Sequence, residues 1–286
     1  MAVESGVAGV VEEDVAFERE GLVLRGILAR PVEGSPADGA VTIHGWGGSR
    51  TGPHRLFVTL GRALAFSGRL SLRFDLSGRG VSDGESRDAS LDNMIDDAVA
   101  AIDLLRTKYM VRRVALVGIC SGGNVAIGAA ALRPREVSHV AALSTLPFAP
   151  QSASRGLGKA AGYLWEYLRK ATSLAVWKRL LRGEASLRGA GRTLARALRE
   201  DPEERRRKDS SRDIMAAFAS FCSPVLFLYG GADPEAAEAR AHFSAFARAN
   251  GLSATFDAVE GSNHNFYSLP WAEAARTKIC DFLARA

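Results

Sequence analysis

The chain has 286 residues, of which 47% are hydrophobic, and its formal net charge is +5. This length fits one large α/β domain or two small ones, and no run of about 18 apolar residues predicts a membrane-spanning helix. The first residues lack the basic and apolar regions of a secretory signal. The three cysteines are an odd number without the spacing of a disulfide framework, so we expect a protein of the reducing cytoplasm.

Along the chain, short apolar runs typical of strands are followed in turn by segments with the apolar spacing of helices. We expect two strands over 14–29 that turn at Glu20-Gly21, then strands over 40–43, 70–74, 114–119, 137–143, 225–229 and 253–259, with helices over 53–67, from the cap Ser90 to 105, over 121–132, 235–250 and 271–286. Because strands alternate with helices after an initial hairpin, the sequence predicts an eight-stranded, mostly parallel sheet with helices on both faces.

A long insertion without strand signals separates the sixth and seventh strands. We expect residues 1–147 and 213–286 to form the core domain, and residues 148–212 a helical cap or lid. The cap holds 16 Lys and Arg against 7 Asp and Glu, a net charge of +9, which leaves −4 for the rest. Its apolar residues have helical spacing, and we expect Trp165 and Trp177 among them to bind substrate. Most of its arginines fit a solvated face, and the rest could steer an anionic substrate or carrier.

Cys120 is the residue around which the chain is organised. It follows a β-branched strand and precedes a buried helix, in the turn Gly118-Ile-Cys120-Ser-Gly122. In a strand-turn-helix nucleophile elbow, the positions two before and two after the nucleophile have no space for side chains. Gly118 and Gly122 meet this requirement for Cys120, whereas Ser121 as nucleophile would place Ile119 at a crowded position. A free cysteine is usually a small buried hydrophobic residue, but this turn favours a nucleophilic thiolate.

Two further residues complete a predicted catalytic triad. His264 follows the last strand, where it could serve as the base, although a surface histidine is the alternative interpretation. Asp233 follows the strand ending at Tyr229, where it could orient the imidazole or simply cap the next helix. The chain order of nucleophile, acid and base favours the triad. The backbone amides of Ser121 and Trp46 are the expected donors of the oxyanion hole, the site that stabilises the negative oxygen of the reaction intermediate.

Four motifs in this order resemble those of α/β-hydrolases, and in particular the serine-aminopeptidase-like esterase group. They are His44-Gly-Trp-Gly-Gly, the loop from Asp75 to Gly84, the turn at Cys120, and Gly230-Gly-Ala-Asp233 with Gly261-Ser-Asn-His264. Segments 96–103 and 177–184 are similar to hydrolases associated with exosortase and exopolysaccharide gene clusters. The cysteine departs from the group, and it is similar to the Gly-x-Cys-x-Gly turn of dienelactone hydrolases and polyhydroxyalkanoate synthases.

The resemblance implies an α/β-hydrolase fold and a cofactor-free esterase or thioesterase that works through an acyl-cysteine. We expect no metal, since no cluster of His, Cys and acidic residues has the spacing of metal ligands. An acyltransferase with the same triad is the first alternative, and a non-catalytic binding scaffold is the second. The expected partner is a small-molecule or carrier-bound acyl substrate, which could be anionic. The run Arg205–Lys208 stands beside two glutamates and is not enough to predict nucleic-acid binding. The acyl group and the oligomeric state are not predicted.

Overall fold

The computed structural model describes residues 9–148 and 209–285, and the described residues up to Phe148 and from Ser210 onward belong to one compact unit. Most of the predicted cap, including Trp165 and Trp177, lies outside the described residues. The boundary between core and cap and the role of the two tryptophans therefore stay predictions. Among the helices that are described, none has both the length and the apolar character needed to cross a membrane.

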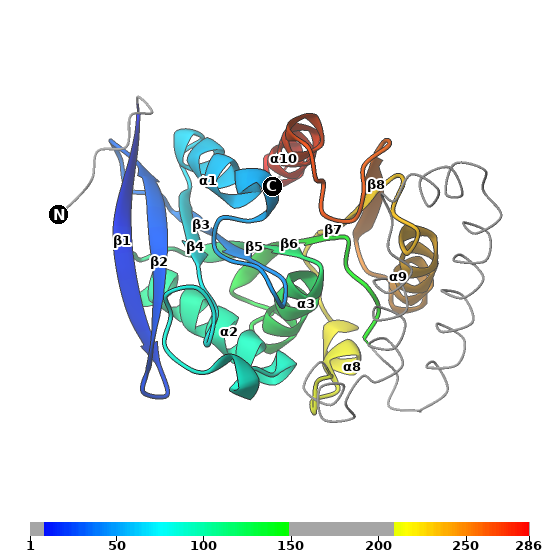
Figure 1. Cartoon of the computed structure of the whole chain (residues 1–286), viewed down its shortest axis with the longest axis horizontal. Helices are drawn as coiled ribbons and strands as arrows, with labels where there is room; N and C mark the ends of the chain where they lie inside the picture. Colours follow the sequence, from blue (N-terminus) through cyan, green and yellow to red (C-terminus); the bar gives the residue numbers. More distant parts are fainter. Residues whose placement is uncertain (1–8, 149–208, 286) are drawn as a thin grey trace, which may run out of the picture. The chain divides into compact units, whose positions relative to one another are not determined.

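The sheet confirms the predicted architecture. Its strands are β1 Val10–Arg19, β2 Leu22–Pro31, β3 Asp38–Ile43, β4 Leu70–Phe74, β5 Arg113–Ile119, β6 Val137–Leu143, β7 Val225–Gly230 and β8 Ala254–Val259. They lie in the order β1-β2-β4-β3-β5-β6-β7-β8 (Figure 1). The pairs β1–β2 and β2–β4 are antiparallel, and all other neighbouring pairs are parallel.

The first hairpin is longer than the predicted span of 14–29. Glu12 and Glu13 break the apolar pattern at the start of β1, so the sequence gives no strand signal there. In the structure Glu12 is 8% exposed and forms ion pairs with Arg62 and Arg73, at 2.6 and 3.0 Å. A buried carboxylate needs such partners, and they are supplied by residues far away in the sequence.

Two sets of helices cover the two faces of the sheet (Figure 1). In the described part of the chain the α-helices are α1 Leu56–Phe66, α2 Leu91–Thr107, α3 Ser121–Leu132, α8 Ile214–Phe218, α9 Ala236–Asn250 and α10 Leu269–Leu283. In β5, Ala115 and Val117 pack in the core on the side of α1 and α10, whereas Val114 and Leu116 pack on the side of α2, α3, α8 and α9. Strand residues point alternately to opposite faces, so a continuous apolar run suits a strand covered on both sides.

The helix boundaries show where local signals hold and where they fail. The predicted cap of α2 is confirmed, since the Ser90 hydroxyl accepts a hydrogen bond from the Asn93 N–H at 3.1 Å. The helix predicted from Pro53 begins only at Leu56. His54 and Arg55 have φ angles of 45° and 60°, a left-handed conformation that cannot continue a right-handed helix.

The strand order determines which loops meet. From β3 to β8 the strands are parallel, so the loops that follow them leave from one edge of the sheet. Because β3 lies between β4 and β5, the loop after β3 has the loop after β4 on one side and the Cys120 turn on the other. Similarly, β7 and β8 are neighbours, so the turn that carries Asp233 lies next to the loop that carries His264.

Candidate active site

Cys120 lies in a strained turn between β5 and α3. Its backbone has φ 56° and ψ −126°, a conformation that residues with side chains rarely adopt. A Cβ atom on Gly122 would lie 2.3 Å from the carbonyl oxygen of Ile43, and one on Gly118 would lie 2.0 Å from that of Gly122. Both contacts are with main-chain atoms, so both positions require glycine. The turn thus has the close approaches that the spacing of its glycines indicates.

Asp233 and His264 are joined by a short hydrogen bond. His264 Nδ1 lies 2.7 Å from Asp233 Oδ2, and a carboxylate can only accept, so Nδ1 carries the proton. Asp233 is 7% exposed, and its other oxygen accepts the Glu235 N–H at 3.1 Å. The two carboxylate oxygens therefore have separate donors.

The loops that carry these two residues are packed closely together. The Ala232 N–H donates to the Ser262 carbonyl at 2.8 Å. A Cβ on Gly230 would lie 2.3 Å from the carbonyl oxygen of Asn263, so the turn after β7 approaches the loop after β8 closely only because residue 230 is glycine. This packing fixes the position of the Asp233 carboxylate relative to the imidazole.

His264 also contacts Cys120. Hydrogen bonding to the Cys120 side chain is the largest cause that raises the pKa of His264 to about 9, and the charge of Cys120 and the bond to Asp233 add to it, while burial opposes it. Because Nδ1 faces Asp233, Nε2 is the nitrogen left for the sulfur. The structure thus brings together the three side chains that the sequence predicts as a triad.

The loop after β3 lies against the Cys120 turn. The Trp46 N–H, predicted to face the oxyanion directly, donates to the Ser121 hydroxyl oxygen at 2.7 Å. The Ser121 N–H is the first of helix α3, and such a group has no acceptor within its helix. Of the two predicted oxyanion donors, the Ser121 N–H has no acceptor within its helix, and the Trp46 N–H is bonded to the Ser121 hydroxyl, to which the sequence assigns no role.

His44 connects this loop to the one after β4. Its Nε2 accepts the Leu76 N–H at 3.1 Å, so its Nδ1 carries the proton and donates to the Gly45 carbonyl at 2.8 Å. Burial lowers the pKa of His44, which keeps the ring neutral and preserves this pair of bonds. His44 therefore has a bracing role beside the candidate site and no free nitrogen for chemistry.

Arg79 is a residue that sequence reasoning missed. Its Nε donates to the Trp46 carbonyl at 2.7 Å, and its guanidinium carbon lies 5.5 Å from the centre of the Trp46 ring. From sequence, the loop from Asp75 to Gly84 has no assigned chemistry. The available signal is topological, because an arginine at the carboxyl end of β4 can reach the loop after β3 only if these strands are neighbours.

Among the described residues, a cluster of possible metal ligands lies at the same edge. Asp233, Glu235 and His264 bring one ligand atom each within 4.8 Å of one another. Nδ1 of His264, however, carries the proton that it donates to Asp233, and a metal needs an unprotonated imidazole nitrogen. The geometry thus fits a hydrogen-bonded acid and base better than a metal centre.

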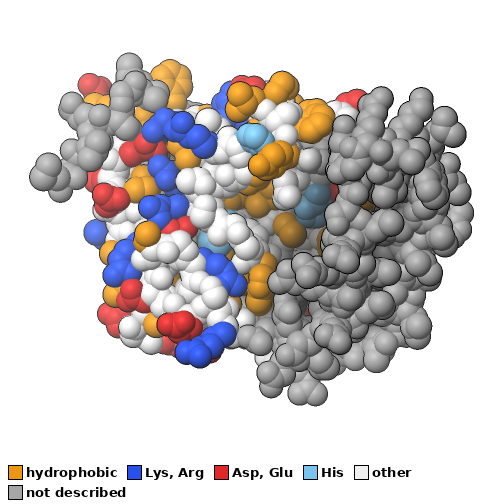
Figure 2. Space-filling view, viewed as in Figure 1, with side chains coloured by type: hydrophobic (Ala, Val, Ile, Leu, Met, Phe, Trp, Pro, Cys, Tyr) orange, Lys and Arg blue, Asp and Glu red, His pale blue; other side chains and the backbone are white. Residues whose placement is uncertain are grey.

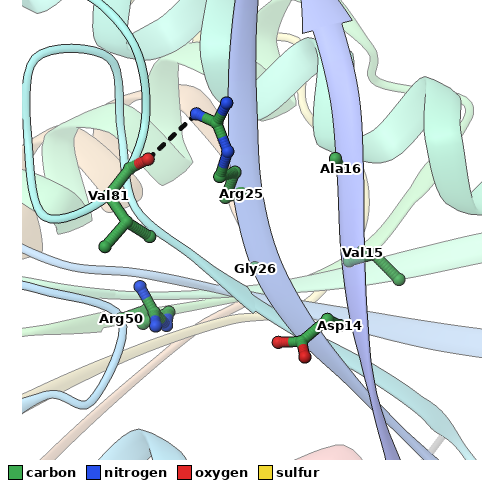
Figure 3. A pocket seen from close by; sticks show the side chains of 7 residues that line it. All are labelled: Asp14, Val15, Ala16, Arg25, Gly26, Arg50 and Val81. Atoms are coloured by element: carbon green, nitrogen blue, oxygen red, sulfur yellow. Dashed lines mark hydrogen bonds between the residues drawn. The ribbon is translucent and has the colours of Figure 1, made fainter. Parts of the chain in front are cut away.

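A separate cavity of about 230 Å³ lies beside the first hairpin (Figure 3). Arg25, Arg50 and Asp14 are its charged lining residues. Both arginines already bind acidic side chains, Arg25 that of Asp83 at 2.6 Å and Arg50 that of Asp75. The cavity contains none of the predicted catalytic residues.

Apolar side chains are exposed just after His264 in the chain. Tyr267 is 64% exposed and Leu269 is 72% exposed, and the Tyr267 ring lies 4.3 Å from the ring of His54. Figure 2 shows hydrophobic side chains gathered around histidines on one face of the described residues. Such an exposed apolar surface suits the apolar part of a ligand better than a highly charged part.

Comparison with known proteins gives a family and a fold. The family model described as alpha/beta hydrolase fold matches residues 41–220, more than half of the chain. No curated protein matches this chain. One similar solved structure is Est1E from Butyrivibrio proteoclasticus with ferulic acid bound, at 17% identity over 95% of this chain and 98% of that chain, with a TM-score of 0.64. A dienelactone hydrolase from Anabaena variabilis is 16% identical over 97% of this chain and 98% of that chain, with a TM-score of 0.62. The thioesterase domain from the curacin biosynthetic pathway is 15% identical over 94% of this chain and 99% of that chain, with a TM-score of 0.62. At such identities the likeness concerns the fold alone.

Proposed function

The chain belongs to the alpha/beta hydrolase fold family, and from this premise we propose that it is an acyl hydrolase, an esterase or thioesterase, with Cys120 as nucleophile, His264 as base and Asp233 as the acid that orients it. The observation that carries the proposal is the chain of contacts from Asp233 through His264 to Cys120, at the turn after β5. We also propose that the chain belongs to the serine-aminopeptidase-like esterase group, with a cysteine in place of the serine nucleophile.

Acylation follows from these positions. The Cys120 thiolate adds to the carbonyl carbon of the substrate, and the π electron pair of the carbonyl moves onto its oxygen. When the C=O bond forms again, the bond to the leaving alcohol or thiol breaks, and the leaving group takes the proton from His264 Nε2. The acyl group is then held as a thioester on Cys120.

Deacylation returns the enzyme to its starting state. His264 Nε2 removes a proton from water as the water oxygen adds to the thioester carbon, and collapse of this second intermediate releases the acid and the Cys120 thiolate. Asp233 accepts the Nδ1–H throughout and stabilises the imidazolium. The net reaction is an ester or thioester plus water giving an acid plus an alcohol or thiol.

The names of the similar structures agree with this chemistry. They include a dienelactone hydrolase, a thioesterase domain and a protein with ferulic acid bound. Transfer of the acyl group to an alcohol in place of water would give an acyltransferase with the same covalent intermediate.

The three cysteines are free, which is in keeping with the predicted cytoplasmic location.

Nucleophile variants test the proposal on p-nitrophenyl butyrate. We expect Cys120→Ala to lose turnover, and Cys280→Ala, a matched change of a second partly buried thiol, to keep it. Adding a short alcohol to the wild-type assay then separates hydrolysis from transfer by whether a butyryl ester forms. Undiminished turnover in Cys120→Ala would refute the assignment.

A further inference from the structure

We propose that the hydroxyl group of Ser121 is the second hydrogen-bond donor of the oxyanion hole, and that the Trp46 amide acts through it. This inference rests on the proposed acyl-cysteine chemistry and assigns a further residue to it. From sequence, Ser121 contributes only its backbone N–H. The observation behind the proposal is the hydrogen bond of 2.7 Å from the Trp46 N–H to the Ser121 hydroxyl oxygen.

The Trp46 amide is held in its orientation from both sides. The preceding carbonyl, that of Gly45, accepts hydrogen bonds from the Gly48 N–H at 2.9 Å and from His44 Nδ1 at 2.8 Å. The carbonyl of Trp46 itself accepts Arg79 Nε at 2.7 Å. Since a peptide unit is planar, fixing the Gly45 carbonyl also fixes the N–H of Trp46. That N–H therefore stays directed at the Ser121 oxygen.

The Ser121 hydroxyl is left with a proton to donate. Its oxygen accepts the Trp46 N–H, and a hydroxyl has one proton that rotates to suit an acceptor. No described residue is an acceptor for that proton. The backbone N–H of Ser121, at the first position of α3, has no acceptor within its helix either. One residue directly after the nucleophile thus offers two donors, its amide and its hydroxyl.

The two donors suit the charge that forms in the reaction. When the Cys120 sulfur bonds to the carbonyl carbon, the electron pair of the C=O bond moves onto oxygen, and the Ser121 hydroxyl donates a hydrogen bond to it while keeping its proton. The hydrogen bond received from Trp46 makes this hydroxyl a stronger donor, because hydrogen bonds in a chain polarise one another. Donors fixed in place before the reaction stabilise the developing oxyanion without reorganising.

If the Trp46 N–H donated directly to the oxyanion, removing the Ser121 hydroxyl would have the opposite effect on turnover. For Trp46 to face the oxyanion, the Ser121 side chain must rotate away and give up its bond. Ser121→Ala would then free the amide, and turnover would stay the same or rise. If the hydroxyl is the donor, the same substitution removes it and lowers turnover.

The experiment compares Ser121→Ala, Ser121→Thr and Ser49→Ala with p-nitrophenyl butyrate as substrate. Loss of one oxyanion donor costs roughly 10²- to 10³-fold in kcat, so we expect a fall toward this range in Ser121→Ala, with KM nearly unchanged. Threonine keeps a hydroxyl and should restore most of the rate. Ser49 lies on the same loop as Trp46, and its hydroxyl bonds to that of Thr51 at 2.9 Å, so its removal should leave kcat unchanged.

A second readout separates the donor role from a structural one. Trifluoromethyl hexyl ketone reacts reversibly with a thiolate, and the adduct carries a negative oxygen. The affinity of the enzyme for this ketone should fall in Ser121→Ala by the same factor as kcat/KM. Unchanged or higher kcat in Ser121→Ala, or equal losses in the alanine and threonine variants, would overturn the inference. Turnover that survives Cys120→Ala would instead defeat the proposed function, whatever the Ser121 variants do.

Discussion

Replacing Asp233 by Asn tests the part of the site whose geometry is best defined. The two oxygens of the carboxylate have different donors, since Oδ2 accepts His264 Nδ1–H at 2.7 Å and Oδ1 accepts the Glu235 N–H at 3.1 Å. Asparagine has one oxygen and one NH₂ group, so one of these two donors must face another donor. Asp233 is 7% exposed, and water cannot readily relieve the mismatch.

The magnitude follows from the bond that is lost. A hydrogen bond to a charged group is worth about 1.5–3 kcal/mol, and about 1.4 kcal/mol corresponds to a tenfold change in rate. We therefore expect kcat/KM to fall by roughly 10- to 150-fold. If the imidazole also turns to the other tautomer, the loss should approach the order of 10⁴ known for triads with a serine nucleophile.

The assay is hydrolysis of p-nitrophenyl butyrate, with the melting temperature of each variant measured alongside. Asp257→Asn is the matched control, because Asp257 lies in β8 and pairs with Lys278 at 2.6 Å on a partly exposed surface, where ion pairs contribute little. Glu235 lies close enough to His264 to replace the lost charge, so the double variant with Glu235→Gln excludes that compensation. Wild-type kcat/KM in a folded double variant would refute the role of Asp233.

Three further predictions concern the turn, the pH profile and the cap. Gly122→Ala should lower the melting temperature strongly, because its Cβ would lie 2.3 Å from the Ile43 carbonyl oxygen. Gly47→Ala is the control and should leave the melting temperature unchanged, since a Cβ there meets no atom within 4 Å. Equal melting temperatures of the two variants would contradict the close packing. The pKa of His264 is raised to about 9 from 6.5, so its imidazolium stabilises the fold fully below pH 6.5 and loses this effect as the pH rises through 9. We expect kcat/KM to fall over the same alkaline range. If Asp233→Asn does not move this fall to lower pH, the result would count against the assignment. The net charge of +9 over residues 148–212 predicts a higher kcat/KM for acyl groups on anionic carriers such as coenzyme A than for neutral thioesters. This difference should shrink at high salt. Equal kcat/KM values at every ionic strength would remove the cap charge from the mechanism.

Sequence alone is sufficient where structure depends on near neighbours. Alternating or continuous apolar runs predict the eight strands, and Ser90 predicts the start of α2, because caps and apolar runs act within a few residues. The glycines around Cys120 indicate a turn too crowded for side chains, and main-chain carbonyls lie where their Cβ atoms would be.

Contacts between distant segments account for what the sequence does not predict. The start of β1 is missed because the partners of Glu12 are Arg62 and Arg73, which no local pattern reveals. The role of Arg79 and the hydrogen bond between Trp46 and Ser121 depend on the order of β4, β3 and β5 in the sheet. The sequence therefore predicts which loops carry the functional residues. It does not predict which donor in one loop faces which acceptor in another.

Mass spectrometry of the intact protein tests the central claim most directly. The protein is incubated briefly with p-nitrophenyl butyrate and with butyryl-coenzyme A, quenched in acid, weighed and then digested to locate the added group. We predict one butyryl group per chain on Cys120 in the wild type, and none at this position in Cys120→Ala. A butyryl group on Ser121, or turnover without any acylated protein when deacylation is slowed by cold and low pH, would contradict the account.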